Sequence, residues 1–294
     1  MADDQKVKAL INLLDDPNEE VFAPVEQVLL QSPVEIVPLL EKAWEQSTDE
    51  LFQSRLTNII HSIQFNDVKN ELSRWIKNDD KELLYGVFLV AKYQYPDLSY
   101  TIINEKLNAL RRDIWLEMHN HLTSLEKVRI VNHVLFDLYG FGRNNSNFFS
   151  PVNNYINDVL ETKKGNPISL SIIYVILCQR LGLPVYGVNL PKNFILAFMD
   201  DAFEGGDFNA NRYASVLFYI NPINKGTVLG RKEIDYFLKQ YHIEPNENLY
   251  YPCSNLEIVM RLLNNLVGAY DAMELHEKKK EIKELLQIFD SHKD

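Results

Sequence analysis

Apolar residues recur at helical spacing along the first third of the chain. The runs that follow the i, i+3, i+4 pattern are 7–14, 19–30, 34–44 and 50–63. Such spacing predicts short amphipathic helices. The polar breaks between and after them are 15–18, 31–33, 46–49 and 65–67. Helices joined by loops this short pack as antiparallel pairs.

The turn LLDDPNEEVF at 13–22 resembles the inter-helix turn of HEAT-type repeats. The sequence therefore predicts HEAT-like helical hairpins over residues 1–97. Stacks of this kind bind other proteins, but they also support a neighbouring domain. Both roles remain open for this region.

Further helices are expected at 98–118 and, capped by Thr123, at 124–140. The next stretch, 139–154, is rich in Gly, Asn and Ser, with aromatic residues between them. This composition predicts an ordered surface loop. A short helix at 154–165 then leads to a longer one at 168–181.

The pattern changes to strands after residue 184. Short runs rich in β-branched and aromatic residues lie at 185–190, 193–200, 215–221 and 227–230. An exposed hairpin loop is expected at 200–212, and helices at 231–241, 254–270 and 274–290. We predict a mostly helical α+β fold in which the 168–181 helix packs on a small antiparallel sheet. The predicted domains are a HEAT-like region at 1–97, an α+β core at 98–245 and a helical hairpin at 246–294.

The charge and composition of the chain limit the kinds of molecule that it is expected to bind. The 294 residues carry a net charge of −11, which argues against binding nucleic acid through its phosphates. The only two cysteines lie 75 positions apart, as in proteins of a reducing compartment. No stretch approaches the roughly 20 apolar residues of a membrane span. We therefore expect a cytoplasmic protein with a protein or peptide partner, and without nucleic acid, membrane or cofactor.

The helix at 168–181 begins where a thiol enzyme would place its nucleophile. Asn166 suits the N-cap position, and Pro167 suits the first helical turn. Cys178 lies about three turns further on, within the apolar run IIYVILC. A cysteine in such a run packs as a small hydrophobic residue. His119 and His121 are too few and too poorly spaced to predict a metal site.

The block KGNPISL…RLGLPVYGVNLP, with SPVNNYINDVL before it and YINPINKGTVLGRKEID after it, resembles the transglutaminase-like core of the bacterial SirB-type family. A similar core occurs in some F-box proteins. The segment SNLEIVMRLLNNLVGAYDAMELHEKKKEIKELL is similar to the tetratricopeptide-like hairpin that closes proteins of this family. The resemblance covers about residues 98–290, and it implies a transglutaminase- and papain-like fold for the core.

Enzymes of that superfamily use Cys, His and Asp, with the Cys at the start of the central helix. By motif, the resemblance maps these positions onto Pro167, Asn193 and Asn221. Proline offers no nucleophile, and an amide cannot act as a base near neutral pH. Loss of the nucleophile or base of such a triad costs on the order of 10⁶ in rate. The resemblance thus implies a pseudoenzyme with a degenerate triad.

The former substrate groove would then be a binding surface or part of the scaffold, lined by Asn166, Ser169, Asn193 and Asn221. Two alternatives remain open. One is an amidase, peptidase or acyltransferase that uses a displaced nucleophile, Ser169 or Cys178. The other is an adaptor that binds its partner through residues 1–95.

Overall fold

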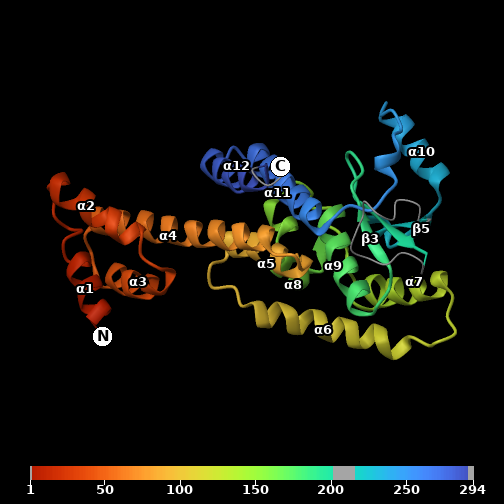
Figure 1. The fold of residues 1–294 in the computed structure, drawn as a ribbon, viewed down its shortest axis with the longest axis horizontal. Coiled ribbons are helices and arrows are strands. Elements are labelled where there is room, and N and C mark those ends of the chain that lie inside the picture. Colours follow the sequence, from red (N-terminus) through yellow and green to blue (C-terminus); the bar gives the residue numbers. More distant parts are fainter. Residues whose placement is uncertain (1, 201–215, 291–294) are drawn as a thin grey trace. The chain divides into compact units, whose positions relative to one another are not determined.

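The computed structural model describes residues 2–200 and 216–290, and its contacts divide the chain into two compact units. One unit comprises Met1–Arg74 and Lys92–Pro96, and the other comprises Trp75–Ala91 and Asp97–Asp294. Figure 1 shows the helices and strands in chain order. The fold is mostly helical with a small sheet, which confirms the predicted α+β class.

The first unit is built from short amphipathic helices. The elements of this region are α1 (Ala2–Ile11), α2 (Glu19–Leu30), η1 (Val34–Ile36), α3 (Val37–Gln46), and parts of α4 (Glu50–Lys77) and α5 (Leu83–Gln94). Their apolar faces form a core around Leu14, Leu29 and Leu40. Arg55 fixes the first turn, since its Nη1 donates to the carbonyl oxygens of Leu14 and Asp16 at 2.8 and 2.7 Å.

The predicted break at 65–67 is wrong. Helix α4 continues through these positions to Lys77. The segment contains neither proline nor glycine, the residues that interrupt helices most strongly. In addition, Asp67 accepts a hydrogen bond from Lys92 Nζ at 2.7 Å, so its polar side chain is satisfied within the helix.

The second unit holds the α+β core and the last helices. Its helical elements beyond α5 are α6 (Tyr100–Glu117), α7 (Ser124–Asn132), η2 (His133–Leu138), η3 (Pro151–Asn154), α8 (Ile156–Thr162), α9 (Pro167–Arg180), η4 (Pro222–Asn224), α10 (Arg231–Gln240), η5 (Glu247–Leu249), α11 (Asn255–Ala272) and α12 (His276–Asp290). The Thr123 cap is confirmed, because Thr123 and Glu126 form a capping box at the start of α7.

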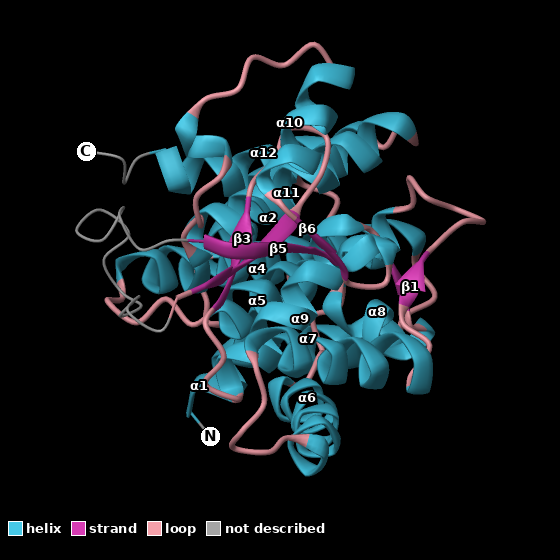
Figure 2. Ribbon diagram, turned by 90° about the vertical axis from the view of Figure 1, so that its right-hand side faces the viewer, coloured by secondary structure: helices cyan, strands magenta, loops and turns pink. Residues whose placement is uncertain are grey.

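Figure 2 shows the small sheet surrounded by helices. In the part of the chain that the structure describes, this antiparallel sheet has the order β3-β4-β5-β6. The strands are β3 (Val185–Val188), β4 (Ile195–Met199), β5 (Val216–Asn221) and β6 (Thr227–Leu229). A separate parallel pair joins β1 (Gly142–Arg143) to β2 (Lys164–Gly165). The hairpin loop expected at 200–212 lies, except for Asp200, outside the described residues.

Helix α9 contacts β3 and β4, whereas α10 contributes to a second apolar cluster with side chains such as Ile195 and Tyr219. Every residue of α9 from Ile168 to Cys178 is buried. A helix that is apolar on all sides is stable only when other elements surround it. The elements that pack around α9 therefore also determine which residues lie near its N-terminal end.

Candidate functional site

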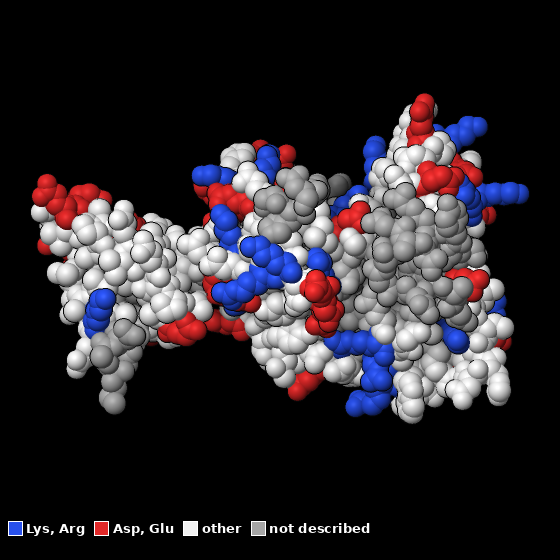
Figure 3. Space-filling view, viewed as in Figure 1, with Lys and Arg blue, Asp and Glu red and all other residues white. Residues whose placement is uncertain are grey.

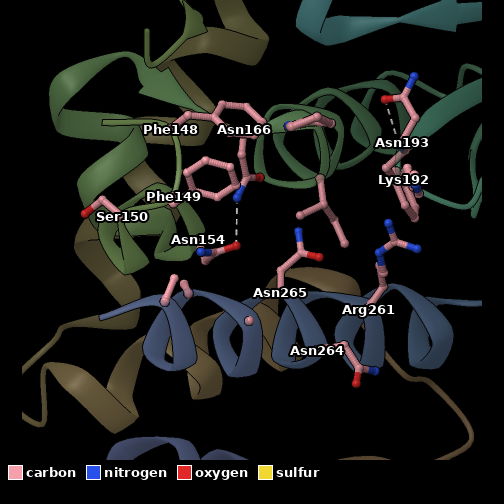
Figure 4. Close-up of a pocket in the computed structure, with 16 residues that line it drawn as sticks. Phe148, Phe149, Ser150, Asn154, Asn166, Lys192, Asn193, Arg261, Asn264 and Asn265 are labelled. Carbon is pink, nitrogen blue, oxygen red and sulfur yellow. Dashed lines mark hydrogen bonds between the residues drawn. The ribbon is translucent and has the colours of Figure 1, made fainter. Parts of the chain in front are cut away.

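A cavity of about 420 Å³ lies at the N-terminal end of α9. Four segments meet there: the loop before α8, the start of α9, the turn before β4, and one face of α11 (Figure 4). The residues that line it are Phe148, Phe149, Ser150, Asn154, Asn166, Pro167, Ile168, Lys192, Asn193, Phe194, Arg261, Asn264, Asn265, Gly268, Ala269 and Ala272. Among these residues there is no Asp, Glu, His or Cys. We call this cavity the α9 pocket.

Asn166 starts α9 and also ties it to the preceding loop. Its side-chain oxygen accepts from the backbone N–H of Ser169 at 3.0 Å, and its amide nitrogen donates to Asn154 Oδ1 at 2.7 Å. The Asn154 amide in turn donates to the carbonyl oxygen of Pro151. Asn154 and Asn166 are both buried. These two amides therefore hold one wall of the pocket in place.

Ser169 is the second residue of the capping box at the start of α9. Its Oγ accepts from the backbone N–H of Asn166 at 3.0 Å and donates to the Asn166 carbonyl oxygen at 3.3 Å. The side chain is buried, and it is not among the residues that line the pocket. The hydroxyl thus satisfies backbone groups at the helix start.

Asn193 lies in the turn that leads into β4. Lys192, just before it, has φ +62°, a left-handed conformation uncommon outside glycine. Asn193 Oδ1 accepts from the backbone N–H of Phe194 at 2.8 Å. Within the described residues its Nδ2 has no hydrogen-bond partner, and Figure 4 shows this nitrogen on the side away from Arg261 and Asn265.

Asn221 ends β5 at the edge of the sheet where β4 begins, because Leu196 pairs with Ile220 in the antiparallel register. It does not line the α9 pocket. Its Oδ1 is buried, and no group in the described part of the chain hydrogen-bonds it. Of the positions expected to line a groove, the structure brings Asn166 and Asn193 to one pocket together with Pro167, and it places Ser169 and Asn221 outside the lining.

Cys178 lies in the packed interior of α9. Its side chain has no exposed surface, and burial raises the pKa of its thiol far above the ordinary value. Cys253 is also buried, and its thiol pKa is raised for the same reason. A neutral, inaccessible thiol is a poor nucleophile.

Arg261 and Lys192 are the cationic residues of the α9 pocket. Arg261 Nη1 donates to Asn189 Oδ1 at 2.9 Å, and burial lowers the pKa of the guanidinium. The Lys192 ammonium lies 5.0 Å from the centre of the Tyr241 ring. Neither cation forms an ion pair with a carboxylate in residues 2–200 and 216–290. The pocket therefore combines positive charge with several amides.

The opposite end of the pocket combines apolar surface with the Asn154 and Asn166 amides. Phe149 is 71% exposed there, which is unusual for so large an aromatic side chain. Gly268, Ala269 and Ala272 form the nearby surface of α11, and Figure 4 shows Phe149 on the far side of the view from Arg261 and Lys192. Apolar surface with a few convergent polar groups is typical of ligand sites.

The sequence did not reveal the contributions of Arg261, Lys192 and Phe149 to this site. Arg261 reaches the start of α9 only through the packing of α11 against α9 and η3. The sequence predicted a helix at 254–270, but not which elements that helix would contact. As for metals, the described residues contain no group of three or more His, Cys, Asp or Glu arranged to hold an ion, and His119 and His121 lie in the loop between α6 and α7.

The comparisons with known proteins agree with this architecture. Residues 102–264 match the family model described as transglutaminase-like superfamily. A UPF0162 protein of Xylella fastidiosa is 26% identical over 203 residues, which cover 66% of this chain and 67% of that protein. F-box only protein 21 of Mus musculus is 31% identical over 138 residues, 47% of this chain but only 21% of that protein.

A further UPF0162 protein, from Pasteurella multocida, is 32% identical over 80 residues, which cover 27% of this chain and 30% of that protein. No solved structure matches the chain. None of the helices within residues 2–200 and 216–290 combines the length and apolar character needed to cross a bilayer. The family model spans more than half of the chain and includes all of α9, so the protein belongs to the transglutaminase-like superfamily.

Proposed function

We propose that this protein is a non-catalytic member of the superfamily, and that its α9 pocket binds a peptide segment of a partner protein. The observation that carries the proposal is the lining of the pocket. Pro167 and Asn193 occupy the positions that the resemblance assigns to the nucleophile and the base, and both line the cavity. No described residue of that lining has a thiol, imidazole or carboxylate to replace them.

Chemistry supports the non-catalytic half of the proposal. Pro167 has no group that attacks a carbonyl, and the Asn193 amide does not accept a proton near neutral pH. Asn221, at the position of the orienting Asp, carries no charge that would stabilise an imidazolium. On this proposal the pocket corresponds to the nucleophile and base positions of the superfamily's active site, without their reactive groups.

Amide chemistry supports the binding half. The Asn265 amide, which points into the cavity in Figure 4, presents both donors and an acceptor, which is what a peptide backbone requires. The volume of about 420 Å³ falls in the usual range for ligand pockets, roughly 300–1,000 Å³. The match to F-box only protein 21 adds support for a role in protein contacts.

Gly268 gives a direct test. Apart from the adjacent residues and the backbone of α11 itself, no described atom lies within 4 Å of the position that a Cβ would take there, so a side chain at this position starts in open space. We expect Gly268→Leu to project into the pocket and to abolish capture of pentapeptides from a fluorescein-labelled random pool. Gly268→Ala is the matched control, since it makes the same helix change with little added volume. Equal capture by wild type and Gly268→Leu would contradict the proposal.

The rival function is that of an amidase, peptidase or acyltransferase with a displaced nucleophile, Ser169 or Cys178. Iodoacetamide labelling of the native protein distinguishes the two. Because both cysteines are buried, we expect neither to be labelled until the protein unfolds. Rapid, selective labelling of native Cys178 would favour the rival.

We also propose the three-part organisation 1–97, 98–245 and 246–294, with the last part as a tetratricopeptide-like hairpin of α11 and α12. These two helices pack against each other directly. A SirB-type affiliation and a cytoplasmic location complete the proposal. Two unpaired cysteines support the latter, because reduced thiols are usual in that compartment.

A further inference from the structure

We infer that the ligand of the α9 pocket is an extended peptide segment with a carboxylate, which Arg261 and Lys192 bind, and with an apolar side chain against Phe149. This inference rests on the proposed peptide-binding function and adds the chemical class of the ligand. Two sources of the carboxylate fit the same chemistry, a chain terminus and an Asp or Glu side chain. The experiment below separates them.

The lack of a carboxylate partner for either cation is the first argument. The chain has 41 acidic and 30 basic residues, so acidic groups are in excess. On the face drawn in Figure 3, Lys and Arg side chains are interspersed with Asp and Glu side chains. Arg261 and Lys192 nevertheless share a pocket with no described acidic residue in its lining. A partly buried guanidinium without a counter-charge is costly, and an incoming anion removes that cost.

The arrangement of the two cations is the second argument. Figure 4 shows the Arg261 and Lys192 side chains at the same end of the pocket, one from α11 and one from the turn before β4. Asn189 accepts from one guanidinium nitrogen, which orients the fork, and within the described residues the other N–H groups have no hydrogen-bond partner. Arg donors match the two oxygens of a carboxylate, and such charge-assisted hydrogen bonds are roughly twice as strong as neutral ones.

The length of the pocket is the third argument. Ala272 lies eleven positions after Arg261 on α11, and both line the cavity. At the α-helical rise this is a span of about 16 Å. An extended chain covers about 3.3 Å per residue, so the pocket accommodates about five residues. A carboxylate at one end therefore leaves an apolar residue about four positions away, beside Phe149 and Ala272.

Uncharged groups in the middle of the pocket suit the peptide backbone between these ends. Asn265 points into the cavity between Asn154 and Arg261 in Figure 4. Within the described residues its amide has no hydrogen-bond partner. It offers an acceptor and donors to the backbone N–H and C=O groups of a bound segment.

The test uses three pools of fluorescein-labelled pentapeptides and the full-length protein. All three have Phe at the first position and random uncharged residues at the middle three. The last residue is Ala with a free carboxylate, Glu with an amidated terminus, or Ala with an amidated terminus. Fluorescence anisotropy gives the affinity of each pool for wild type, Arg261→Gln and Lys192→Gln. Lys280→Gln removes an exposed charge from α12 and is the control.

We expect one acidic pool to bind at least about tenfold more tightly than the neutral pool, from the strength of charge-assisted hydrogen bonds. Tighter binding of the free-acid pool assigns the site to chain termini, and tighter binding of the Glu pool assigns it to side chains. Arg261→Gln and Lys192→Gln should each remove most of this preference, whereas Lys280→Gln should keep it. Lys192→Gln leaves α11 unchanged, so it tests the inference even if Arg261→Gln unfolds.

Other outcomes are equally informative. If the neutral pool binds as well as the acidic pools, or if both charge variants keep the preference, the carboxylate inference is wrong while peptide binding stands. If no pool binds the wild-type protein, both the inference and the proposed function fail.

Discussion

Replacing Asn166 by alanine should destabilise the start of α9 far more than an ordinary helix cap would. The substitution removes the hydrogen bond that the Asn166 side chain accepts from the backbone N–H of Ser169. It also leaves the buried side-chain oxygen of Asn154 without its donor. Loss of an N-cap costs about 1 kcal/mol, and an unsatisfied buried polar group costs about 1–3 kcal/mol. We therefore expect a loss of about 2–4 kcal/mol in the free energy of opening this helix.

Cys178 reports that opening directly, because it lies in the same helix and is buried. Its labelling rate with excess iodoacetamide, measured by mass spectrometry of the peptide that contains it, follows the population of the open form. At about 1.4 kcal/mol per factor of ten, labelling should be about 30- to 700-fold faster in Asn166→Ala.

Thr123→Ala is the matched control. It removes the capping box of α7, whose Thr123 and Glu126 side chains are exposed, so that water replaces the lost partner. We expect about 0.5–1 kcal/mol, and hence at most about a fivefold increase in Cys178 labelling. A labelling rate in Asn166→Ala no higher than in Thr123→Ala would refute the reasoning that Asn166 anchors the pocket wall.

Two further predictions concern stability. Gly268→Ala should raise the free energy of unfolding by about 0.5–1 kcal/mol in urea titrations, because alanine favours the helix and a Cβ there enters open space. A loss of stability would show that the glycine has a packing role. Burial raises the pKa of Tyr219 from 10.0 to about 12, so the folded protein holds this proton more tightly than the unfolded chain does. Its contribution is therefore complete below pH 10 and is lost as the pH rises towards 12. Urea midpoints measured from pH 9 to 11 should fall, and should fall less steeply in Tyr219→Phe; an unchanged slope in that variant would contradict the assignment.

Local chemistry explains which elements the sequence predicted well. Proline and N-cap residues mark the start of α9 at Asn166 and Pro167, and short runs of β-branched and aromatic residues mark the strands that follow. The break predicted at 65–67 failed because Asn and Asp only weakly disfavour helix, and the Asp67–Lys92 ion pair satisfies the polar group within α4.

The candidate site was only partly predictable for a different reason. Motif positions led to Asn166, Pro167 and Asn193, which the structure brings to one pocket. The cations could not be found in this way, because Arg261 lies 94 positions after Pro167 and meets it only through tertiary packing. Periodicity identifies the buried side of a helix such as α11 but not the element that its polar side faces.

The central claim is that the α9 pocket binds a peptide and does not react with it. The most direct measurement is the mass of bound pentapeptides eluted from the wild-type protein, together with the mass of the protein itself. The account predicts that both masses are unchanged after prolonged incubation, and that Gly268→Leu retains no peptide. Cleaved peptide, or a covalent adduct on the protein, that disappears in Gly268→Leu would contradict it.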